Sequence, residues 1–167
     1  MNKEISRKYL EIKSINDLRE SKYPGKEYFI SLINKNDFQL NKFLYKQIGK
    51  KYRWIDRLEW TDQKWINYVS NENLITFILK NNEEVVGYFE LIIHYKNKEI
   101  EIAYFGILEE YFGKKLGGYL LCEAIKKSFL LGANRIWLHT CSLDHENALK
   151  NYLSRGMTIF KEETLKL

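Results

Sequence analysis

The chain has 167 residues, of which 45% are hydrophobic and 29% are charged, and its formal net charge is +5. This balance is typical of a globular protein and excludes a disordered chain, and the length suits one hydrophobic core, so we expect residues 1–167 to form a single domain. No stretch approaches the roughly 20 apolar residues of a membrane helix, and the first residues lead into no signal peptide, so we expect a cytoplasmic protein with no membrane partner.

The basic residues and the cysteines exclude two further classes of protein. Lysines are spread along the chain with acidic residues between them, and no stripe of Lys or Arg follows one element, so we expect no nucleic-acid partner. Cys122 and Cys141 have neither the number nor the spacing of a disulfide scaffold or a zinc site. We therefore expect two reduced cysteines and no bound metal.

In chain order, the N-terminal part predicts one weak strand and two helices. Residues 8–13 alternate weakly and predict a short strand, and Pro24–Gly25 marks a turn. Asp37 is the expected N-cap of a first helix, which stops at Gly49. Thr61 is the expected N-cap of a second helix. The apolar residues expected on the buried sides of these helices are Phe38, Leu40, Phe43, Leu44 and Ile48, and then Trp65, Ile66 and Val69.

The middle of the chain changes to a period of two, which indicates strands. The three predicted strands cover residues 74–80, 84–95 and 99–108. Because the connections between them are short turns, neighbouring strands are expected to be antiparallel.

The period becomes helical again at Leu116, and Gly132 supplies the stop. Residues 135–141 predict a strand after this helix. A strand, a helix and a strand in succession favour a right-handed parallel crossover, so residues 99–141 are expected to form a βαβ unit. The remaining predicted elements are a helix over residues 145–155 and a strand over residues 157–165.

Glycines gather where the long helix is expected to begin. Gly113, Gly117 and Gly118 lie at this turn, with Lys114 and Lys115 between them. The first N–H groups of a helix lack intrahelical partners and the helix dipole is positive there, so the turn is suited to hold an anion such as a pyrophosphate. The alternative is that the glycines permit close packing of the helix on the sheet and that the lysines are simply solvated.

Residues 112–117, Phe-Gly-Lys-Lys-Leu-Gly, resemble the pyrophosphate turn of the GNAT superfamily of acetyl-CoA-dependent N-acetyltransferases, which reads Gln/Arg-x-x-Gly-x-Gly/Ala. Phe112 replaces the usual Gln or Arg and Lys115 replaces the first glycine, whereas Gly117 matches the second. Because Lys115 carries a Cβ atom, we expect its backbone to adopt a conformation open to ordinary residues.

A second segment carries the resemblance, which extends over residues 84–157. Ala148 is followed four residues later by Tyr152, and then by a closing glycine and an apolar residue, as in a GNAT helix. The resemblance implies an α/β (α+β) fold with a mixed, mainly antiparallel sheet of about six or seven strands, flanked by about four helices around the βαβ unit. It also implies acetyl-CoA as co-substrate, and transfer of the acetyl group to an amine of a small molecule or protein by direct attack in a ternary complex.

The resemblance further implies that the strand over residues 101–108 splays from the strand over residues 135–141, which leaves backbone groups free for the pantetheine arm of acetyl-CoA. The residues expected to contact this cofactor are Phe105, Gly106, Ile107, Phe112, Gly113, Lys114, Lys115, Leu116, Gly117, Gly118, His145, Asn147 and Tyr152. Tyr152 is also expected to protonate the departing sulfur. The alternative is that its ring only packs.

Two residues compete for the role of the base that deprotonates the incoming amine. Glu101 lies where histone-acetylating members of the superfamily carry a base, and its alternative is an exposed strand glutamate. His139 titrates near neutral pH, and its alternative is a satisfied core histidine.

The acceptor site is expected beside the first two helices and their connection, which roof the acetyl end in the superfamily. Its candidate residues are Tyr45, Trp54, Asp56, Arg57 and Trp60. Aromatic rings with acids suit a cation, although core packing with solvated charge explains these residues equally well. A non-catalytic acyl-CoA-binding sensor or interaction module stays open as an alternative to the enzyme, and both a monomer and a homodimer are compatible with the sequence.

Overall fold

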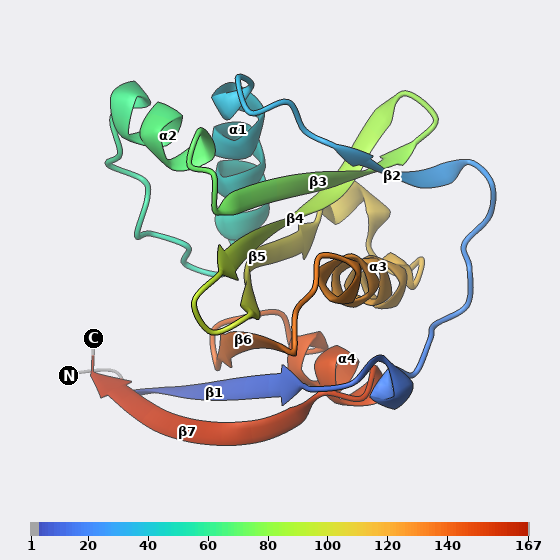
Figure 1. The fold of residues 1–167 in the computed structure, drawn as a ribbon. Coiled ribbons are helices and arrows are strands. Elements are labelled where there is room, and N and C mark those ends of the chain that lie inside the picture. Colours follow the sequence, from blue (N-terminus) through green and yellow to red (C-terminus); the bar gives the residue numbers. More distant parts are fainter. Residues whose placement is uncertain (1–3, 167) are drawn as a thin grey trace.

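The fold is built on one seven-stranded sheet, seen in a computed structural model that describes residues 4–166. The strands are β1 (Glu4–Ile12), β2 (Tyr28–Leu32), β3 (Leu74–Asn81), β4 (Glu84–His94), β5 (Glu99–Ile107), β6 (Arg135–Cys141) and β7 (Thr158–Lys166). Their order across the sheet is β2-β3-β4-β5-β6-β1-β7 (Figure 1). Only β5 and β6 pair in parallel among these described strands, so the predicted mixed, mainly antiparallel α/β fold is confirmed.

Helices cover both faces of the sheet. They are α1 (Phe38–Gly49), α2 (Asp62–Val69), α3 (Leu116–Leu130) and α4 (Ala148–Ser154), with short 3-10 turns at Ile15–Asp17 and Glu109–Tyr111. Phe89 and Leu91 of β4 belong to the core cluster that includes α3, whereas Tyr88 belongs to the cluster that includes α1. Because successive strand residues point to opposite faces, α1 and α3 lie on opposite sides of the sheet. Among residues 4–166, no helix has both the length and the apolar character needed to cross a membrane.

Both predicted N-caps are confirmed. A side-chain oxygen of Asp37 accepts a hydrogen bond from the backbone N–H of Leu40 at 3.3 Å. The hydroxyl of Thr61 accepts one from the backbone N–H of Lys64 at 3.2 Å. Each cap satisfies a donor that the first helical turn leaves without a partner, and so fixes where the helix begins.

Two residues predicted to be buried on these helices are exposed instead. Phe43 is 50% exposed and Ile66 is 39% exposed. The buried face of α1 passes through Asn41, Leu44, Tyr45 and Ile48. A polar residue thus occupies a core position, where its Nδ2 group donates the hydrogen bonds described below. A pattern of apolar residues alone could not reveal this face.

The predicted βαβ unit is confirmed, and it opens toward one end. Within the described residues, pairing of β5 with β6 is confined to three positions, the last of which joins Glu101 to Trp137. Farther along, Ile102 and Tyr104 pair with consecutive residues of β4, so Ala103 forms a bulge. A bulge shifts the alternation by one residue, which brings Glu101 and Tyr104 to the same face of the sheet.

Two features of the fold have no counterpart in the sequence analysis. β2 was not predicted, and β1 lies between β6 and β7, antiparallel to both. The last helix also begins later than predicted, at Ala148. The residues before it form a turn in which Nδ1 of His145 accepts a hydrogen bond from the backbone N–H of Asn147 at 3.0 Å.

Candidate active site

A single large cleft contains most of the predicted site residues. Its volume is about 1280 Å³, and its walls come from the connection between α1 and α2, the diverging ends of β5 and β6, the start of α3, and α4. The predicted residues that line it are Trp54, Asp56, Arg57, Glu101, Phe105, Gly106, Ile107, Phe112, Gly113, Lys115, Leu116, Gly117, Gly118, His139, His145, Asn147 and Tyr152. Residues far apart in the chain therefore meet at one place.

The turn before α3 has a backbone conformation that the sequence did not predict. Lys115, the N-cap of α3, has a φ of 59° and lies in the left-handed region, where we expected an ordinary conformation. Gly113, two residues earlier, has a φ of 80°. The side chain of Lys115 makes no capping hydrogen bond, so the first N–H groups of a 15-residue helix are left to a ligand or solvent.

Gly117 and Gly118 differ in what a side chain would meet. A Cβ atom on Gly117 would have only Nδ2 of Asn151 nearby, at 3.6 Å, which is an ordinary contact. A Cβ atom on Gly118 would lie 3.0 Å from Nη1 of Arg155 and 3.1 Å from Cβ of Ser21. Packing therefore accounts for Gly118, whereas Gly117 leaves open space on the cleft side. This space fits a group that approaches the backbone closely, such as a pyrophosphate.

Basic residues that the sequence analysis missed lie in the same part of the cleft. Arg155, Lys22 and Lys150 line it, and Nε of Arg155 is buried without a hydrogen-bond partner in the part of the chain that the structure describes. Arg155 is the last residue before the closing Gly156, and its Nη1 lies beside Gly118, a proximity that its position in the sequence does not predict. Lys114, in contrast, lies outside the cleft, with Nζ 5.4 Å from the ring of Tyr111.

Tyr152 lies deeper in the cleft and is only 7% exposed. Its ring meets that of Phe105 edge to face, with centroids 6.2 Å apart. Ala148, one turn earlier on α4, also lines the cleft, so the small residue leaves space beside the ring. Burial raises the pKa of Tyr152, with a further rise from Asp144, so its hydroxyl carries a proton at neutral pH.

The ring of His145 contacts the rings of Phe112 and Tyr52, which lie in two other segments of the cleft wall. The ring of His145 lies 5.4 Å from that of Phe112, at the turn before α3, and 6.1 Å from that of Tyr52, in the connection between α1 and α2. These edge-to-face contacts hold the turn before α4 against both neighbouring segments. They account for the positions of Phe112 and His145 at the cleft wall.

The two candidate bases have different surroundings. The side chain of Glu101 is 18% exposed, and burial raises its pKa while His94 opposes the rise. His139 lies two residues beyond Trp137 on β6 and is partly exposed to solvent. One side of its ring packs 5.6 Å from the ring of Tyr9, so burial, followed by the charge of Arg7, lowers its pKa. Both line the cleft. The raised pKa makes Glu101 a stronger base than an ordinary carboxylate, whereas the lowered pKa makes His139 a weaker base than an ordinary imidazole.

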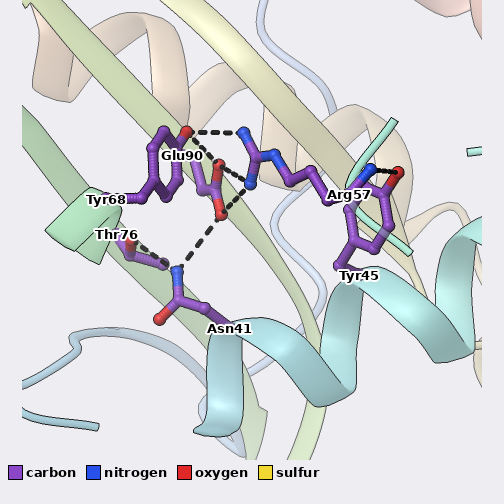
Figure 2. A network of polar contacts seen from close by, with 6 residues as sticks. All are labelled: Asn41, Tyr45, Arg57, Tyr68, Thr76 and Glu90. Atoms are coloured by element: carbon purple, nitrogen blue, oxygen red, sulfur yellow. Dashed lines mark hydrogen bonds and ion pairs between the residues drawn. The ribbon is translucent and has the colours of Figure 1, made fainter. Parts of the chain in front are cut away.

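The wall below the α1–α2 connection is a buried polar network (Figure 2). The guanidinium of Arg57 donates to both carboxylate oxygens of Glu90, at 3.1 and 3.2 Å, and Tyr68 donates to the same carboxylate at 2.7 Å. Asn41 donates to Glu90 at 3.2 Å and to Thr76 at 3.0 Å. Burial lowers the pKa of Arg57, but the Glu90 carboxylate together with Tyr68, Tyr104 and Tyr88 outweighs this effect, so the pKa is raised. Arg57 therefore keeps its charge.

Two of the predicted acceptor residues lie behind this wall. Tyr45 is fully buried, and its hydroxyl accepts a hydrogen bond from the backbone N–H of Arg57 at 3.1 Å. Trp60 does not line the cleft, and its ring lies 4.9 Å from Cζ of Arg57. We therefore correct the expectation that they face an acceptor: the cation that these aromatic rings enclose is Arg57 itself.

Comparisons with known proteins address the family directly. The sequence model of the acetyltransferase (GNAT) family matches residues 38–157, which is more than half of the chain. The chain belongs to this family. A comparison with curated proteins finds no match.

Solved structures support the GNAT fold of this protein. A GCN5-related N-acetyltransferase from Sphaerobacter thermophilus superposes with a TM-score of 0.74 at 12% identity, covering 97% of this chain and 51% of that one. The GNAT protein described here thus spans about half the length of that relative. An aminoglycoside acetyltransferase from an uncultured soil metagenomic sample has a TM-score of 0.66 at 13% identity, covering 80% and 90%. PaiA N-acetyltransferase from Thermoplasma acidophilum, solved with coenzyme A, has a TM-score of 0.50 at 21% identity, covering 63% and 74%.

In this GNAT protein the candidate site contains no evident metal centre. Within residues 4–166, no three His, Cys, Asp or Glu side chains are grouped as metal ligands, and both cysteines are free. The chemistry available at the cleft is that of hydrogen-bond donors, carboxylates, imidazoles and phenols.

Proposed function

We propose that this protein is an N-acetyltransferase that transfers the acetyl group of acetyl-CoA to a primary amine. One observation carries the proposal: a single cleft joins the start of α3, the phenol of Tyr152 and the carboxylate of Glu101. These are the three groups that amide formation from a thioester requires, namely an anion site for the cofactor, an acid and a base. Membership of the GNAT family supports the same chemistry.

We assign the cofactor to the part of the cleft that begins at the turn before α3. The N–H groups at the start of the helix and the open face of Gly117 suit the pyrophosphate, and Arg155 supplies a buried donor without a partner beside it. The backbone of β5 at Phe105 to Ile107 pairs with β4 but not with β6, and it lines the route toward Tyr152. Acetyl-CoA supplies an acetyl thioester, whose C–S bond breaks as the amide C–N bond forms.

Glu101 and Tyr152 then move the protons. An alkylammonium is not a nucleophile, so Glu101 accepts its proton directly or through one water molecule, and its raised pKa makes it a better base than an exposed carboxylate. Tyr152 donates its proton to the sulfur that leaves and is reprotonated by the second proton that the amine nitrogen loses as the amide forms. Glu101 returns the first proton to solvent. Because a thiolate is a fair leaving group, the acid contributes less than the base.

The test measures CoA release from acetyl-CoA with a panel of primary amines. We expect Glu101→Gln to reduce turnover by about 100-fold at neutral pH and Tyr152→Phe to reduce it by about tenfold or more, while acetyl-CoA still raises the melting temperature of both variants. If His139→Gln loses activity and Glu101→Gln does not, His139 is the base. Stabilisation by acetyl-CoA without CoA release for any amine would identify a non-catalytic sensor, and the absence of stabilisation would refute the whole proposal.

A further inference from the structure

β1 extends the floor of the cleft beyond β6 and carries a guanidinium. Arg7 lines the cleft and pairs with Cys141 of β6 on one side and with Glu163 of β7 on the other. Residues that pair across a sheet point to the same face, and so do residues two apart in a strand. Arg7 therefore shares the face of His139 and Glu101, on the side of the sheet away from α3.

The guanidinium of Arg7 is poorly satisfied by the protein. The closest carboxylate, that of Glu163, is 3.6 Å from Nη1, which is an ion-pair distance but too long for a hydrogen bond. Glu163 already accepts a hydrogen bond from Tyr9 at 2.6 Å and lies 3.6 Å from Nζ of Lys161, so one carboxylate faces two cations. Within the described residues, Nε of Arg7 is buried and has no hydrogen-bond partner.

An unpartnered guanidinium N–H costs free energy, and a carboxylate is the group that removes this cost most completely. Its two oxygens match the planar fork of Arg and accept two parallel, charge-assisted hydrogen bonds. Asp56 and Glu101 line the same cleft and favour a cationic group. The cleft wall therefore carries, besides Arg7, carboxylates that can face the amine of an acceptor.

We infer that the acceptor is a primary amine that also carries a carboxylate, such as an amino acid, and that Arg7 binds this carboxylate while the amine faces Glu101. The inference rests on the proposed acetyltransferase function and adds the substrate class. A simple alkylamine lacks the group that would pair with Arg7, so the protein should distinguish acceptors that differ only in the carboxylate.

Matched pairs of acceptors test this inference: tyrosine against tyramine, tryptophan against tryptamine, and lysine against cadaverine. The readout is the ratio of kcat/KM for the amino acid to that for the amine, in wild type and variants, so that intrinsic differences in amine reactivity cancel. We expect Arg7→Gln to lower this ratio by about tenfold or more, because it removes charge-assisted hydrogen bonds, and to do so mainly through KM. Arg7→Lys keeps the charge without the fork and should lower the ratio less.

Lys8→Gln is the matched control. Lys8 is the next residue of β1, points to the opposite face and lies 3.5 Å from Glu162, so its replacement removes the same charge from the same strand without touching the cleft. We expect the ratio to stay within about twofold of wild type in this variant. An Arg7→Gln variant that changes both members of a pair equally would overturn the inference while leaving the acetyltransferase proposal intact.

A binding measurement separates the two proposals. Tyrosine and tyramine are titrated calorimetrically into wild type, Arg7→Lys and Lys8→Gln. This measurement requires no turnover, and all three proteins keep a positive charge at residue 7. If no amine is acetylated, the proposed function fails, but tighter binding of tyrosine that depends on Arg7 still supports the carboxylate site. Equal binding of tyrosine and tyramine, or binding of neither, overturns it.

Discussion

The carboxylate of Glu101 lies 3.8 Å from Nε2 of His94, which has no hydrogen-bond partner among the described residues. The ring of His94 is held by stacking on Trp137, with centroids 6.1 Å apart. Burial raises the pKa of Glu101, and the neighbouring His94 opposes this rise. Replacing His94 by Gln removes this opposing effect, so we expect the pKa of Glu101 to rise and the acidic limb of the pH profile of kcat/KM to move to higher pH. Superimposable limbs for wild type and His94→Gln, measured with one acceptor, would contradict this.

The raised pKa of Glu101 also predicts how stability depends on pH. The folded protein binds the proton of the Glu101 carboxyl more tightly than the unfolded chain does. The contribution of this proton to the free energy of unfolding is therefore fully present below the unfolded pKa of about 4.3, and it is lost as the pH rises through the folded pKa. Glu101→Gln stays neutral, so it should gain stability relative to wild type between about pH 4 and pH 8. Urea unfolding of both proteins at the two pH values measures this, and a constant difference would show that burial of Glu101 has no such effect.

Gly117 and Gly118 should respond differently to the same substitution. Gly117→Val has space for its Cβ atom, so we expect it to fold and to lose most of the stabilisation of about 2.7 kcal/mol that acetyl-CoA gives at 100-fold excess over its dissociation constant. Gly118→Val meets Arg155 and Ser21 and should destabilise the fold itself by about 1–3 kcal/mol. Thermal unfolding with and without acetyl-CoA distinguishes them. Full stabilisation of Gly117→Val by the ligand would remove the pyrophosphate assignment.

Lys115 has a left-handed backbone that glycine adopts without strain. Lys115→Gly should therefore stabilise the unliganded protein by about 1 kcal/mol. Lys114→Gly removes the same charge at the neighbouring position, but Lys114 does not have a positive φ. The added backbone freedom of glycine should therefore destabilise the protein or leave its stability unchanged. Denaturant unfolding of both variants gives the comparison, and equal shifts in the same direction would contradict the role of the left-handed conformation.

The Arg57–Glu90 pair should be strongly coupled. Arg57→Met leaves the carboxylate of Glu90, which is fully buried, without its cation and should cost about 3–5 kcal/mol. The double variant Arg57→Met, Glu90→Leu removes both charges and should be less destabilised than the sum of the single variants. A double-mutant cycle in urea measures the coupling, and strict additivity would show that the pair is not a unit.

The elements that the sequence predicted well are those with local signals. Asp37 and Thr61 cap helices through their own side chains, and alternation over residues 74–108 identified three strands joined by tight turns. β2 is short and lies at the edge of the sheet, so it has little periodicity to detect. The place of β1 depends on pairing with strands more than a hundred residues away along the chain, about which local pattern carries no information.

The residues of the candidate site also differ in whether a local sequence signal identifies them. The glycine turn and the spacing from Ala148 to Tyr152 are local, and these residues line one cleft. Aromatic residues beside acids have the same pattern whether they enclose a ligand or a protein cation, so sequence could not separate Tyr45 and Trp60 from true cleft residues. Glu90 and Arg7 were missed because their partners come from other elements, and only the folded sheet brings them together.

The insertion of β1 between β6 and β7 sets the order in which a nascent chain completes its sheet. β1 is synthesised before the other strands of this sheet, yet its partners are β6 and β7, so its two edges stay unpaired until those strands have been made. The meander of β3, β4 and β5 needs only short turns and can pair much earlier. Meanwhile β1 presents the exposed hydrogen-bonding edges that favour association between chains. We therefore expect nascent β1 to be the segment that most needs a chaperone.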